Sequence, residues 1–283
     1  MLHFIVTGGC GFIGGHLVRK LVEEFEVSIT VVDDQRQGKY IVNHPDVTYV
    51  LKNVCDYWPT RHYDGIIHLA NTPRIRMSLE EPKESIENNL MPTLQVMEWA
   101  RALSTPVYFA CSSSTKFSGE FNNPYTFGKR VCEGLLHLYG IHYGVKYYYM
   151  FFYNVYGPGE ADYGEHSTVI RAFKKKFLAG EPLRIYGTGR KTRDFTHVDD
   201  VTSGIIKLLQ EKKKPGVIHL GAGYPYSIND IAEAFDHPAI NEFDKPGESQ
   251  HTQCDNPYVL AKHNVIDYIK DWVKRNGNAK ASN

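Results

Sequence analysis

The stretch TGGCGFIGG at residues 7–15 decides the fold of this chain. Its glycines Gly9, Gly11 and Gly14 follow the spacing Gly-x-Gly-x-x-Gly. An apolar run at residues 2–6 predicts a strand before the stretch, and apolar side chains at helical spacing predict a helix after it. A strand, a glycine turn and a helix in this order favour a loop in which bare backbone N–H groups and a helix N-terminus bind a pyrophosphate.

An acidic residue ends the next predicted strand. The β-branched run at residues 27–32 stops at Asp33, about 25 residues after the first glycine. A carboxylate there can accept hydrogen bonds from the adenosine ribose hydroxyls and repels a 2′-phosphate, so it favours NAD over NADP, although the nearby Arg36 weakens that preference. The acid also argues against the alternative, in which the glycine turn only connects a strand and a helix. Asp56, after the following strand, is a candidate contact for the adenine amino group or a simple turn residue.

Strands and helices alternate along the first part of the chain. Apolar runs predict further strands at residues 47–51, 65–69, 107–111, 145–152 and 217–220. Helical spacing predicts helices at residues 84–103, 126–143 and 168–178. Such alternation implies βαβ units, and fully apolar strands fit a sheet covered on both faces. The expected fold class is α/β, with a Rossmann-type doubly wound parallel sheet.

Composition bounds the class of protein. The chain has 283 residues, of which 42% are apolar and 23% charged, and its 32 basic residues balance its 32 acidic ones. Such a balance lacks the basic footprint of a nucleic-acid binder, and no apolar run approaches the roughly 20 residues that span a bilayer. Glycines interrupt the N-terminus, which argues against a signal peptide, and the five cysteines form no C-x-x-C pair. We therefore expect a cytoplasmic, reduced protein without a zinc site.

A tyrosine and a lysine lie four residues apart at the start of a predicted helix. Tyr125 and Lys129 share one face of that helix, and an ammonium near a phenol favours the phenolate, which can act as an acid/base near neutral pH. The chain holds 19 tyrosines, so this spacing alone is weak. The hydroxyl run at residues 112–115 strengthens it, because that run follows a predicted strand at the edge where parallel sheets bind ligands. Together with a nicotinamide, these groups would make a hydride-transfer site for an alcohol and a ketone.

These residues also carry a family resemblance. The chain resembles the extended short-chain dehydrogenase/reductases, and within them the NAD-dependent nucleotide-sugar epimerase/dehydratase family. The matching stretches are TGGCGFIGGHLV, HLANTP, ENNLMPT, CSSSTKFSGE, NPYTFGK, FYNVYGPG and IYGTGRKTRDFTHVDDV. The resemblance implies an NAD-binding Rossmann domain at residues 1–153 with 194–221. It also implies a smaller α/β domain for the nucleotide sugar at residues 154–193 with 222–283.

The resemblance implies roles for particular residues. Its catalytic set corresponds to Ser114, Tyr125 and Lys129. The residues expected to bind NAD are Gly8, Gly11, Phe12, Ile13, Gly14, Asp33, Val54, Asp56, Leu69, Ala70, Asn88, Tyr125 and Lys129. The residues expected to bind the substrate are Ser114, Asn154 and Arg193. Arg74, which follows the fourth predicted strand, could meet a substrate carboxylate or phosphate, or lie in a solvated loop.

Two departures from the family pattern bear on the reaction. Family dehydratases and decarboxylases usually carry an acid one or two residues after the catalytic hydroxyl, where this chain has Thr115 and Lys116. The segment between Gly119 and Tyr125 is also short, which leaves the sugar open. We therefore expect a 4-epimerase that acts on a UDP-hexose, such as UDP-glucose/UDP-galactose or the N-acetylated pair, through a 4-keto intermediate. The alternatives are a UDP-glucuronate decarboxylase or nucleotide-sugar 4,6-dehydratase with another acid, such as Glu120, and a non-catalytic NAD-binding regulatory protein.

The resemblance further implies the partners of the chain. A nucleotide sugar is the expected substrate, and neither nucleic acid nor a membrane is expected to bind. Many relatives dimerise through the helices that here carry Asn88 and Lys129. A homodimer with twofold symmetry is therefore expected by analogy.

Overall fold

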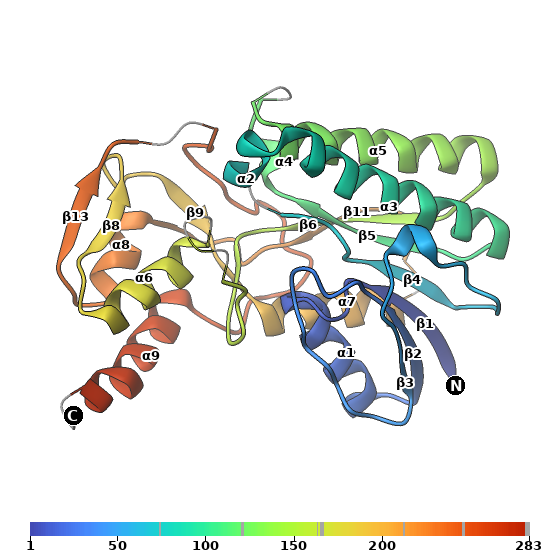
Figure 1. Ribbon diagram of the computed structural model, residues 1–283, viewed down its shortest axis with the longest axis horizontal. Coiled ribbons are helices and arrows are strands. Elements are labelled where there is room, and N and C mark those ends of the chain that lie inside the picture. Colours follow the sequence, from blue (N-terminus) through green and yellow to red (C-terminus); the bar gives the residue numbers. More distant parts are fainter. Residues whose placement is uncertain are drawn as a thin grey trace. The chain divides into compact units, whose positions relative to one another are not determined.

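The protein is described by a computed structural model (Figure 1). The chain divides into two compact units, Met1–Phe151 with Thr202–Ile218 and Phe152–Val201 with His219–Asn283. The structure describes residues 1–73, 75–119, 122–162, 164, 167–211, 213–244 and 247–280. Which ligand each part of the chain binds remains a prediction.

A seven-stranded sheet forms the centre of the first unit, in the order β11-β6-β5-β4-β1-β2-β3. β1 pairs in parallel with β2 and β4, and the pairs β2–β3 and β4–β5 are also parallel. The strands are β1 (Leu2–Thr7), β2 (Val27–Val32), β3 (Val47–Val50), β4 (Gly65–His68), β5 (Val107–Ser112), β6 (Tyr147–Phe152) and β11 (Gly216–Leu220). This sheet confirms the predicted α/β class and the predicted strands, with bounds shifted by one or two residues.

Helices cover both faces of this sheet. In Figure 1, α3 (Pro82–Leu103) and α5 (Pro124–Tyr143) lie side by side on one face, and α1 (Phe12–Glu24) lies on the other. The predicted helices at 84–103 and 126–143 are thus confirmed. Each begins with a proline, which suits this position because the N–H groups of a helix's first turn have no acceptor within the helix, so the N–H that proline lacks is not missed. The remaining helices of this part are η1 (Val54–Asp56), α2 (Ile75–Glu80), α4 (Ser114–Phe117) and α7 (Val198–Gln210).

The strand order changes direction between β1 and β4. From β1 the sheet continues through β2 and β3 on one side, and through β4, β5 and β6 on the other. In open parallel sheets, the crevice at the carboxyl ends of the strands at such a switch point is where ligands bind. The segments that leave these ends are the glycine stretch after β1 and Leu69-Ala70 after β4.

The second unit has its own core. Its strands are β7 (Val155–Tyr156), β8 (Leu183–Tyr186), β9 (Thr192–Asp194), β10 (Thr196–His197), β12 (Pro225–Ser227) and β13 (Ala239–Glu242). Its helices are α6 (Val169–Ala179), α8 (Ile228–Ala234) and α9 (Val265–Lys280). Buried aromatic residues from α6 and the end of α8, among them Phe173, Phe177 and Phe235, hold these helices against β8. The predicted helix at 168–178 is confirmed as α6.

Two observations concern the chain's chemistry as a whole. Within the part of the chain that the structure describes, no helix combines the length and the apolar character that a membrane crossing requires. All five cysteines are free thiols, and every one except Cys55 is buried. The predicted cytoplasmic location remains a prediction.

Candidate active site

The glycine stretch forms a tight turn that leads directly into α1. Gly8 has a φ of 73°, and its carbonyl oxygen accepts a hydrogen bond from the N–H of Gly11 at 3.1 Å. A Cβ added at Gly14 would collide with the Gly8 carbonyl oxygen and lie 2.7 Å from the Cα of Gly9. The turn therefore tolerates only glycine at position 14, because the first turn of the helix packs directly on the loop backbone.

The same loop lies against the residues that follow β4. A Cβ on Gly8 would lie 2.6 Å from the backbone nitrogen of Ala70, and 2.7 Å from the carbonyl carbon of Leu69. Thr7 fixes this approach, since its carbonyl oxygen accepts from Leu69 N at 3.0 Å and its hydroxyl accepts from Ala70 N at 3.3 Å. The structure thus brings the predicted phosphate loop and the predicted cofactor wall together.

Asp33 ends β2 beside the glycine loop. Its Oδ2 accepts a hydrogen bond from Cys10 N at 2.9 Å, and its Oδ1 accepts from Gln35 N at 2.7 Å. Burial raises the pKa of Asp33, while these two N–H groups act in the opposite direction. Bare glycine backbone and a carboxylate on adjacent strand ends are the groups that a dinucleotide's pyrophosphate and ribose require, so the residues present fit NAD.

Arg36 is paired with its own loop. Its Nε donates to Asp34 Oδ2 at 2.6 Å, and its Nη1 donates to Asn88 Oδ1 at 3.3 Å. Asp34 also accepts from the side chain of Asn53 at 3.4 Å. The positive charge of Arg36, which weakened the preference for NAD, is therefore balanced by the carboxylate of Asp34. The predicted cofactor contact Asn88 is half-buried and accepts a hydrogen bond from Arg36.

The segment after β3 contains one site candidate that the sequence analysis missed. Val54 is buried, as a residue beside the adenine would be, whereas Asp56 is exposed in the 3-10 helix η1. Asn53 caps that helix through its Oδ1, which accepts from Cys55 N at 2.9 Å, and it reaches the Asp33-Asp34 loop through its Nδ2. Asn53 is thus the polar side chain that joins this segment to the end of β2.

A second missed candidate is Asn89, the neighbour of Asn88. Asn89 is fully buried, and its Nδ2 donates to the Ser85 carbonyl at 2.6 Å and to the Thr72 carbonyl at 3.3 Å. Its Oδ1 is buried and has no hydrogen-bond partner among the described residues. The helical spacing offered a signal, since positions 85, 89 and 93 share one face of α3 and all three are buried.

His68 ends β4 and is a buried structural residue. Its Nδ1 lies 2.6 Å from the Thr7 hydroxyl, and its Nε2 lies 3.2 Å from the Thr93 hydroxyl, so one ring joins β1, β4 and α3. Burial lowers the pKa of His68 to about 3, and the nearby Lys129 adds to this effect. The ring is therefore neutral in the folded protein at ordinary pH.

This lowered pKa predicts a specific loss of stability in acid. The unfolded chain protonates His68 near its ordinary pKa of 6.5, whereas the folded chain resists until about 3, so the free energy of unfolding falls as pH drops below 6.5. Between about pH 6.5 and pH 5 the contribution of His68 is about 2 kcal/mol, at ~1.4 kcal/mol per pH unit. In urea titrations the free energy of unfolding of His68→Gln should fall by about 2 kcal/mol less than that of the wild type between about pH 6.5 and pH 5. The control His62→Gln, which replaces an exposed histidine, should show the full wild-type decrease. Equal acid sensitivity in all three proteins would contradict the assignment.

Tyr125 and Lys129 lie on the first two turns of α5. The Asn123 side chain caps this helix by accepting from Thr126 N at 2.8 Å, which fixes the turn that carries Tyr125. Lys129 is 2% exposed, and its Nζ donates to the Ala110 carbonyl of β5 at 2.8 Å. Burial lowers the pKa of Lys129 to about 8. The ammonium is thus held inside the protein, against the strand that leads to Ser114.

Ser114 begins α4, directly after β5. Its hydroxyl lies 2.6 Å from that of Ser112, and α4 packs against α5. Thr115 turns away from this hydroxyl pair, because its Oγ1 donates to the Ser112 carbonyl at 2.8 Å, and Arg130 of α5 donates to the Thr115 carbonyl. The structure therefore gathers Ser114, Tyr125 and Lys129 on adjoining elements at the carboxyl end of β5.

Two of the predicted substrate residues, Asn154 and Arg193, lie in the second unit. Asn154 has a φ of 28°, and its Nδ2 donates to the Asp194 carbonyl at 3.0 Å. The neighbouring Arg193 donates to Glu248 Oε2 at 3.2 Å; burial lowers the pKa of Arg193, while Glu248 acts in the opposite direction. Asn154 and Arg193 are thus brought together. Arg74 and Glu120 lie outside the described residues.

Asp194 organises this part of the second unit, although the sequence analysis gave it no role. It is fully buried, and its two carboxylate oxygens accept from the backbone N–H groups of Ala222, Gly223 and Cys254 at 2.8 to 2.9 Å. Burial raises the pKa of Asp194, while these donors favour the charged form. Asp194 therefore fixes the backbone next to Arg193 by joining three segments that are distant in sequence.

One group of side chains has the composition of a metal site. His197, Asp199 and His263 bring possible ligand atoms within 4.8 Å of one another. However, the rings of His197 and His263 are stacked, with centroids 4.2 Å apart and planes inclined by 22°. A metal ion binds a histidine in the plane of its ring, so it cannot lie in both of these nearly parallel planes. The cluster acts as packing in the arrangement described.

The fold and these residues define a Rossmann-type protein with a tyrosine, a lysine and a serine at the edge where such sheets bind ligands. Residues 4–221 match the profile of the family described as NAD dependent epimerase/dehydratase. The chain belongs to this family. The match confirms the resemblance seen in the sequence, and with it NAD as the cofactor.

Individual relatives agree with this membership. The chain is 29% identical to a putative UDP-glucose 4-epimerase of Methanocaldococcus jannaschii, over 96% of this chain and 98% of the relative. It is 28% identical to a UDP-N-acetyl-alpha-D-glucosaminuronate decarboxylase of Bacillus cytotoxicus, over 81% of this chain and 78% of the relative. Among solved structures, a UDP-N-acetylglucosamine 4-epimerase from Methanobrevibacter ruminantium M1, in complex with UDP-N-acetylmuramic acid, matches with a TM-score of 0.86 and 25% identity, over 96% of this chain and 97% of that one.

Proposed function

We propose that the protein is an NAD-dependent 4-epimerase of a UDP-hexose. The observation that carries the proposal is the group formed by Tyr125, Lys129 and Ser114 in a chain that has no carboxylate at positions 115 and 116. The similarity to 4-epimerases over nearly the whole chain supports the same activity. The identity of the sugar is part of the proposal, with UDP-glucose/UDP-galactose and the N-acetylated pair as the candidates.

The proposed mechanism moves a proton at the sugar's 4-hydroxyl oxygen and a hydride at the carbon that bears it. NAD, held by the glycine loop and Asp33, would supply the hydride-transfer chemistry at that carbon. Tyr125 takes the proton of the 4-hydroxyl and later gives it back, and Ser114 hydrogen-bonds the same oxygen. With its pKa lowered to about 8, Lys129 remains mostly protonated at pH 7, and its charge favours the phenolate of Tyr125.

The nucleotide side of the substrate is assigned to the second unit. Arg193 would hold a phosphate of the UDP group, because a guanidinium matches phosphate geometry with two parallel donors. In the structure this guanidinium donates a hydrogen bond to the carboxylate of Glu248. A bound diphosphate would therefore take the place of the carboxylate as the anionic partner of Arg193. Asn154 would contact the sugar or the phosphates, and the buried Asp194 would keep both residues in position.

A decarboxylase or dehydratase is the second candidate, since one relative is a decarboxylase. Both reactions need an acid or base beyond Tyr125, and Thr115 and Lys116 are not carboxylates. Thr115 is also engaged with the Ser112 carbonyl. The structure of this loop therefore supports the epimerase over the second candidate.

Product analysis tests the proposed function directly. The purified protein would be incubated in turn with UDP-glucose, UDP-galactose and their N-acetylated forms, and the products separated by chromatography. Interconversion of either pair without added NAD supports the proposal, because the cofactor is regenerated in each cycle. Release of carbon dioxide from UDP-glucuronate, or a stable 4-keto product, would select the second candidate. NAD binding without turnover of any sugar would select the regulatory protein.

The quaternary structure forms part of the same proposal. We propose a homodimer in which α3 and α5 of two copies pair. Apolar side chains are exposed on both helices, namely Met91, Leu138 and Ile141. Such a face favours association with a second copy. Analytical ultracentrifugation should give about twice the 32.3 kDa mass of one chain.

A further inference from the structure

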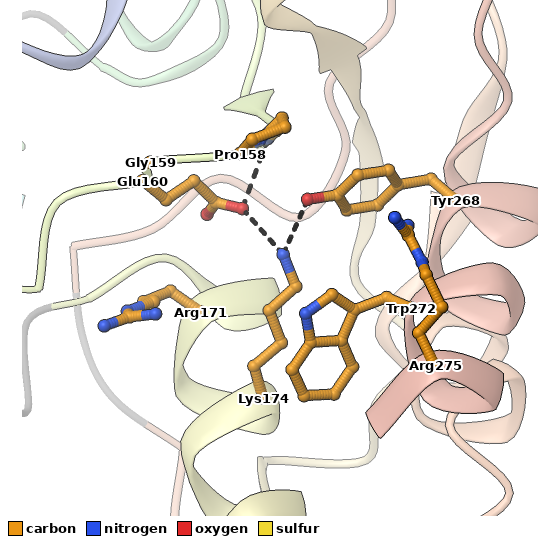
Figure 2. Close-up of a pocket in the computed structure, with 9 residues that line it drawn as sticks. Pro158, Gly159, Glu160, Arg171, Lys174, Tyr268, Trp272 and Arg275 are labelled. Atoms are coloured by element: carbon orange, nitrogen blue, oxygen red, sulfur yellow. Dashed lines mark hydrogen bonds and ion pairs between the residues drawn. The ribbon is translucent and has the colours of Figure 1, made fainter. Parts of the chain in front are cut away.

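A pocket lies in the second unit, between the turn after β7 and the helices α6 and α9 (Figure 2). Its volume is about 200 Å³. Its lining residues are Gly157, Pro158, Gly159, Glu160, Arg171, Lys174, Tyr268, Trp272 and Arg275. We call it the Lys174 pocket. None of these residues is among those predicted to bind NAD or the nucleotide sugar.

A buried ammonium forms the floor of the Lys174 pocket. Lys174 is 5% exposed, and its Nζ donates to the Tyr268 hydroxyl at 2.8 Å and to Glu160 Oε1 at 3.5 Å. Figure 2 shows this ammonium between the two oxygens, with the Trp272 indole beside it. An ammonium has three protons, and the Tyr268 oxygen accepts here. Among the residues that the structure describes, a third ammonium proton and the phenol's own proton have no acceptor oxygen and are available for a ligand.

The carboxylate in the lining of the Lys174 pocket is already engaged. Glu160 is buried, and its Oε1 accepts from Gly157 N at 3.3 Å as well as from Lys174. Its Oε2 accepts from the Thr168 hydroxyl at 2.6 Å. The carboxylate is therefore a structural acceptor that balances one positive charge, and it offers little to a ligand.

Positive charge exceeds negative charge around the pocket. Lys174, Arg171 and Arg275 contribute three positive charges against the single carboxylate of Glu160. Burial lowers the pKa of Lys174 and Glu160 raises it, while Arg171 and Arg275 lower it further because each repels the ammonium. Asp162, outside the lining, lies 3.5 Å from Arg171 and offsets part of the excess.

Both arginines have donors to spare. The Nε of Arg171 is buried without a hydrogen-bond partner in the described ranges. The Arg275 guanidinium has one hydrogen bond within that part of the chain, from its Nε to the Asp271 carbonyl at 3.2 Å. The buried Nε of Arg171 and the ammonium that both arginines repel become more stable when an oxyanion enters, and the exposed Arg275 can turn its remaining donors to the same anion.

We propose that the Lys174 pocket binds a small anion that carries a phosphate group. Phosphate supplies several acceptor oxygens and at least one negative charge, which are the two properties that the lining lacks. A volume of about 200 Å³ is far above the ~10–15 Å³ that one water requires on the same measure, so the pocket admits phosphate with a small organic substituent. The source is either inorganic phosphate or a small phosphate ester.

Tryptophan fluorescence tests this proposal on the whole protein with its NAD. Trp272 is one of three tryptophans and lines the pocket, whereas Trp58 and Trp99 belong to the first unit. Sodium phosphate and glycerol phosphate would be titrated separately, at an ionic strength held constant with sodium chloride. We expect a saturable change in fluorescence together with a rise in Tm. The tighter of the two titrants identifies the source, and Trp272→Phe should lose the fluorescence change but keep the Tm shift.

Matched charge variants locate the binding. Arg275→Gln should weaken phosphate binding about tenfold, which is about 1.4 kcal/mol. Lys274→Gln removes the same charge from an exposed neighbour on α9 and should leave the affinity unchanged. Arg193→Gln should also leave it unchanged, which separates this pocket from the proposed UDP site. An equal loss in Lys274→Gln, a loss in Arg193→Gln alone, or a response without saturation would overturn the proposal.

Discussion

Replacing Tyr125 by phenylalanine is expected to lower kcat by about three orders of magnitude, within the ~10²- to 10⁴-fold range of acid/base catalysis. The substitution removes only the hydroxyl that takes the sugar's proton. The ring remains, so the 8% exposed side chain still fills its site at the start of α5. Substrate turnover, followed by chromatography of the nucleotide sugars, is the measurement.

Two further measurements separate chemistry from structure in this variant. NAD released from the denatured protein should remain at the wild-type ratio, because the glycine loop and Asp33 are untouched. Tyr143→Phe is the matched control, since it removes a hydroxyl at the exposed end of the same helix and should leave kcat unchanged. Substantial turnover by Tyr125→Phe, or equal loss in the control, would remove the role given to Tyr125.

Replacing Gly14 by alanine is expected to lower NAD affinity at least tenfold and the free energy of unfolding by about 1–3 kcal/mol. The added methyl would collide with the Gly8 carbonyl oxygen and crowd the Cα of Gly9, and backbone atoms cannot rotate away as a side chain can. The loop must shift, and its backbone N–H groups then no longer point at the pyrophosphate of the expected NAD. Isothermal titration with NAD and urea unfolding give the two values.

A second glycine provides the matched control for this prediction. Gly134 lies in α5, and a Cβ added there meets no atom within 4 Å. Gly134→Ala should therefore stabilise the protein by about 0.5–1 kcal/mol, as alanine does in a helix interior, and leave NAD binding unchanged. Wild-type NAD affinity in Gly14→Ala would show that the loop does not hold the cofactor as assigned.

The central sheet could be predicted because its signals are local. The apolar runs that became β4 and β5 are almost entirely buried, and β1 is buried from Phe4 onward, so their pattern is continuous and strand-length. α5 was equally readable, since Pro124 and a capping Asn123 mark its start. The short strands β9 and β12 form only by pairing with each other, and they are far apart in the sequence. No local sequence pattern therefore predicts them.

The part of the candidate site that depends on the spacing of residues along one helix could be predicted from the sequence. Tyr125 and Lys129 are four residues apart on one helix face, and the structure places them there. Asn89 marks the limit, because the sequence analysis gave it no role and the structure shows that its side chain is buried. The role of the adjacent Asn88 stays a prediction. The role of Asp194 depends on Ala222 and Cys254, which folding alone brings to it, so no motif revealed it.

The buried carboxylate of Asp194 sets a limit on how the chain can be shortened. A fragment that ends before Cys254 would lose one of the N–H donors that hold this charge, and with it the anchor of the segment beside Arg193. An enclosed negative charge with fewer donors is costly, so such a fragment would loosen around β9. A C-terminal truncation should therefore keep the chain at least through Cys254, although the segment between β13 and that residue contains few regular elements.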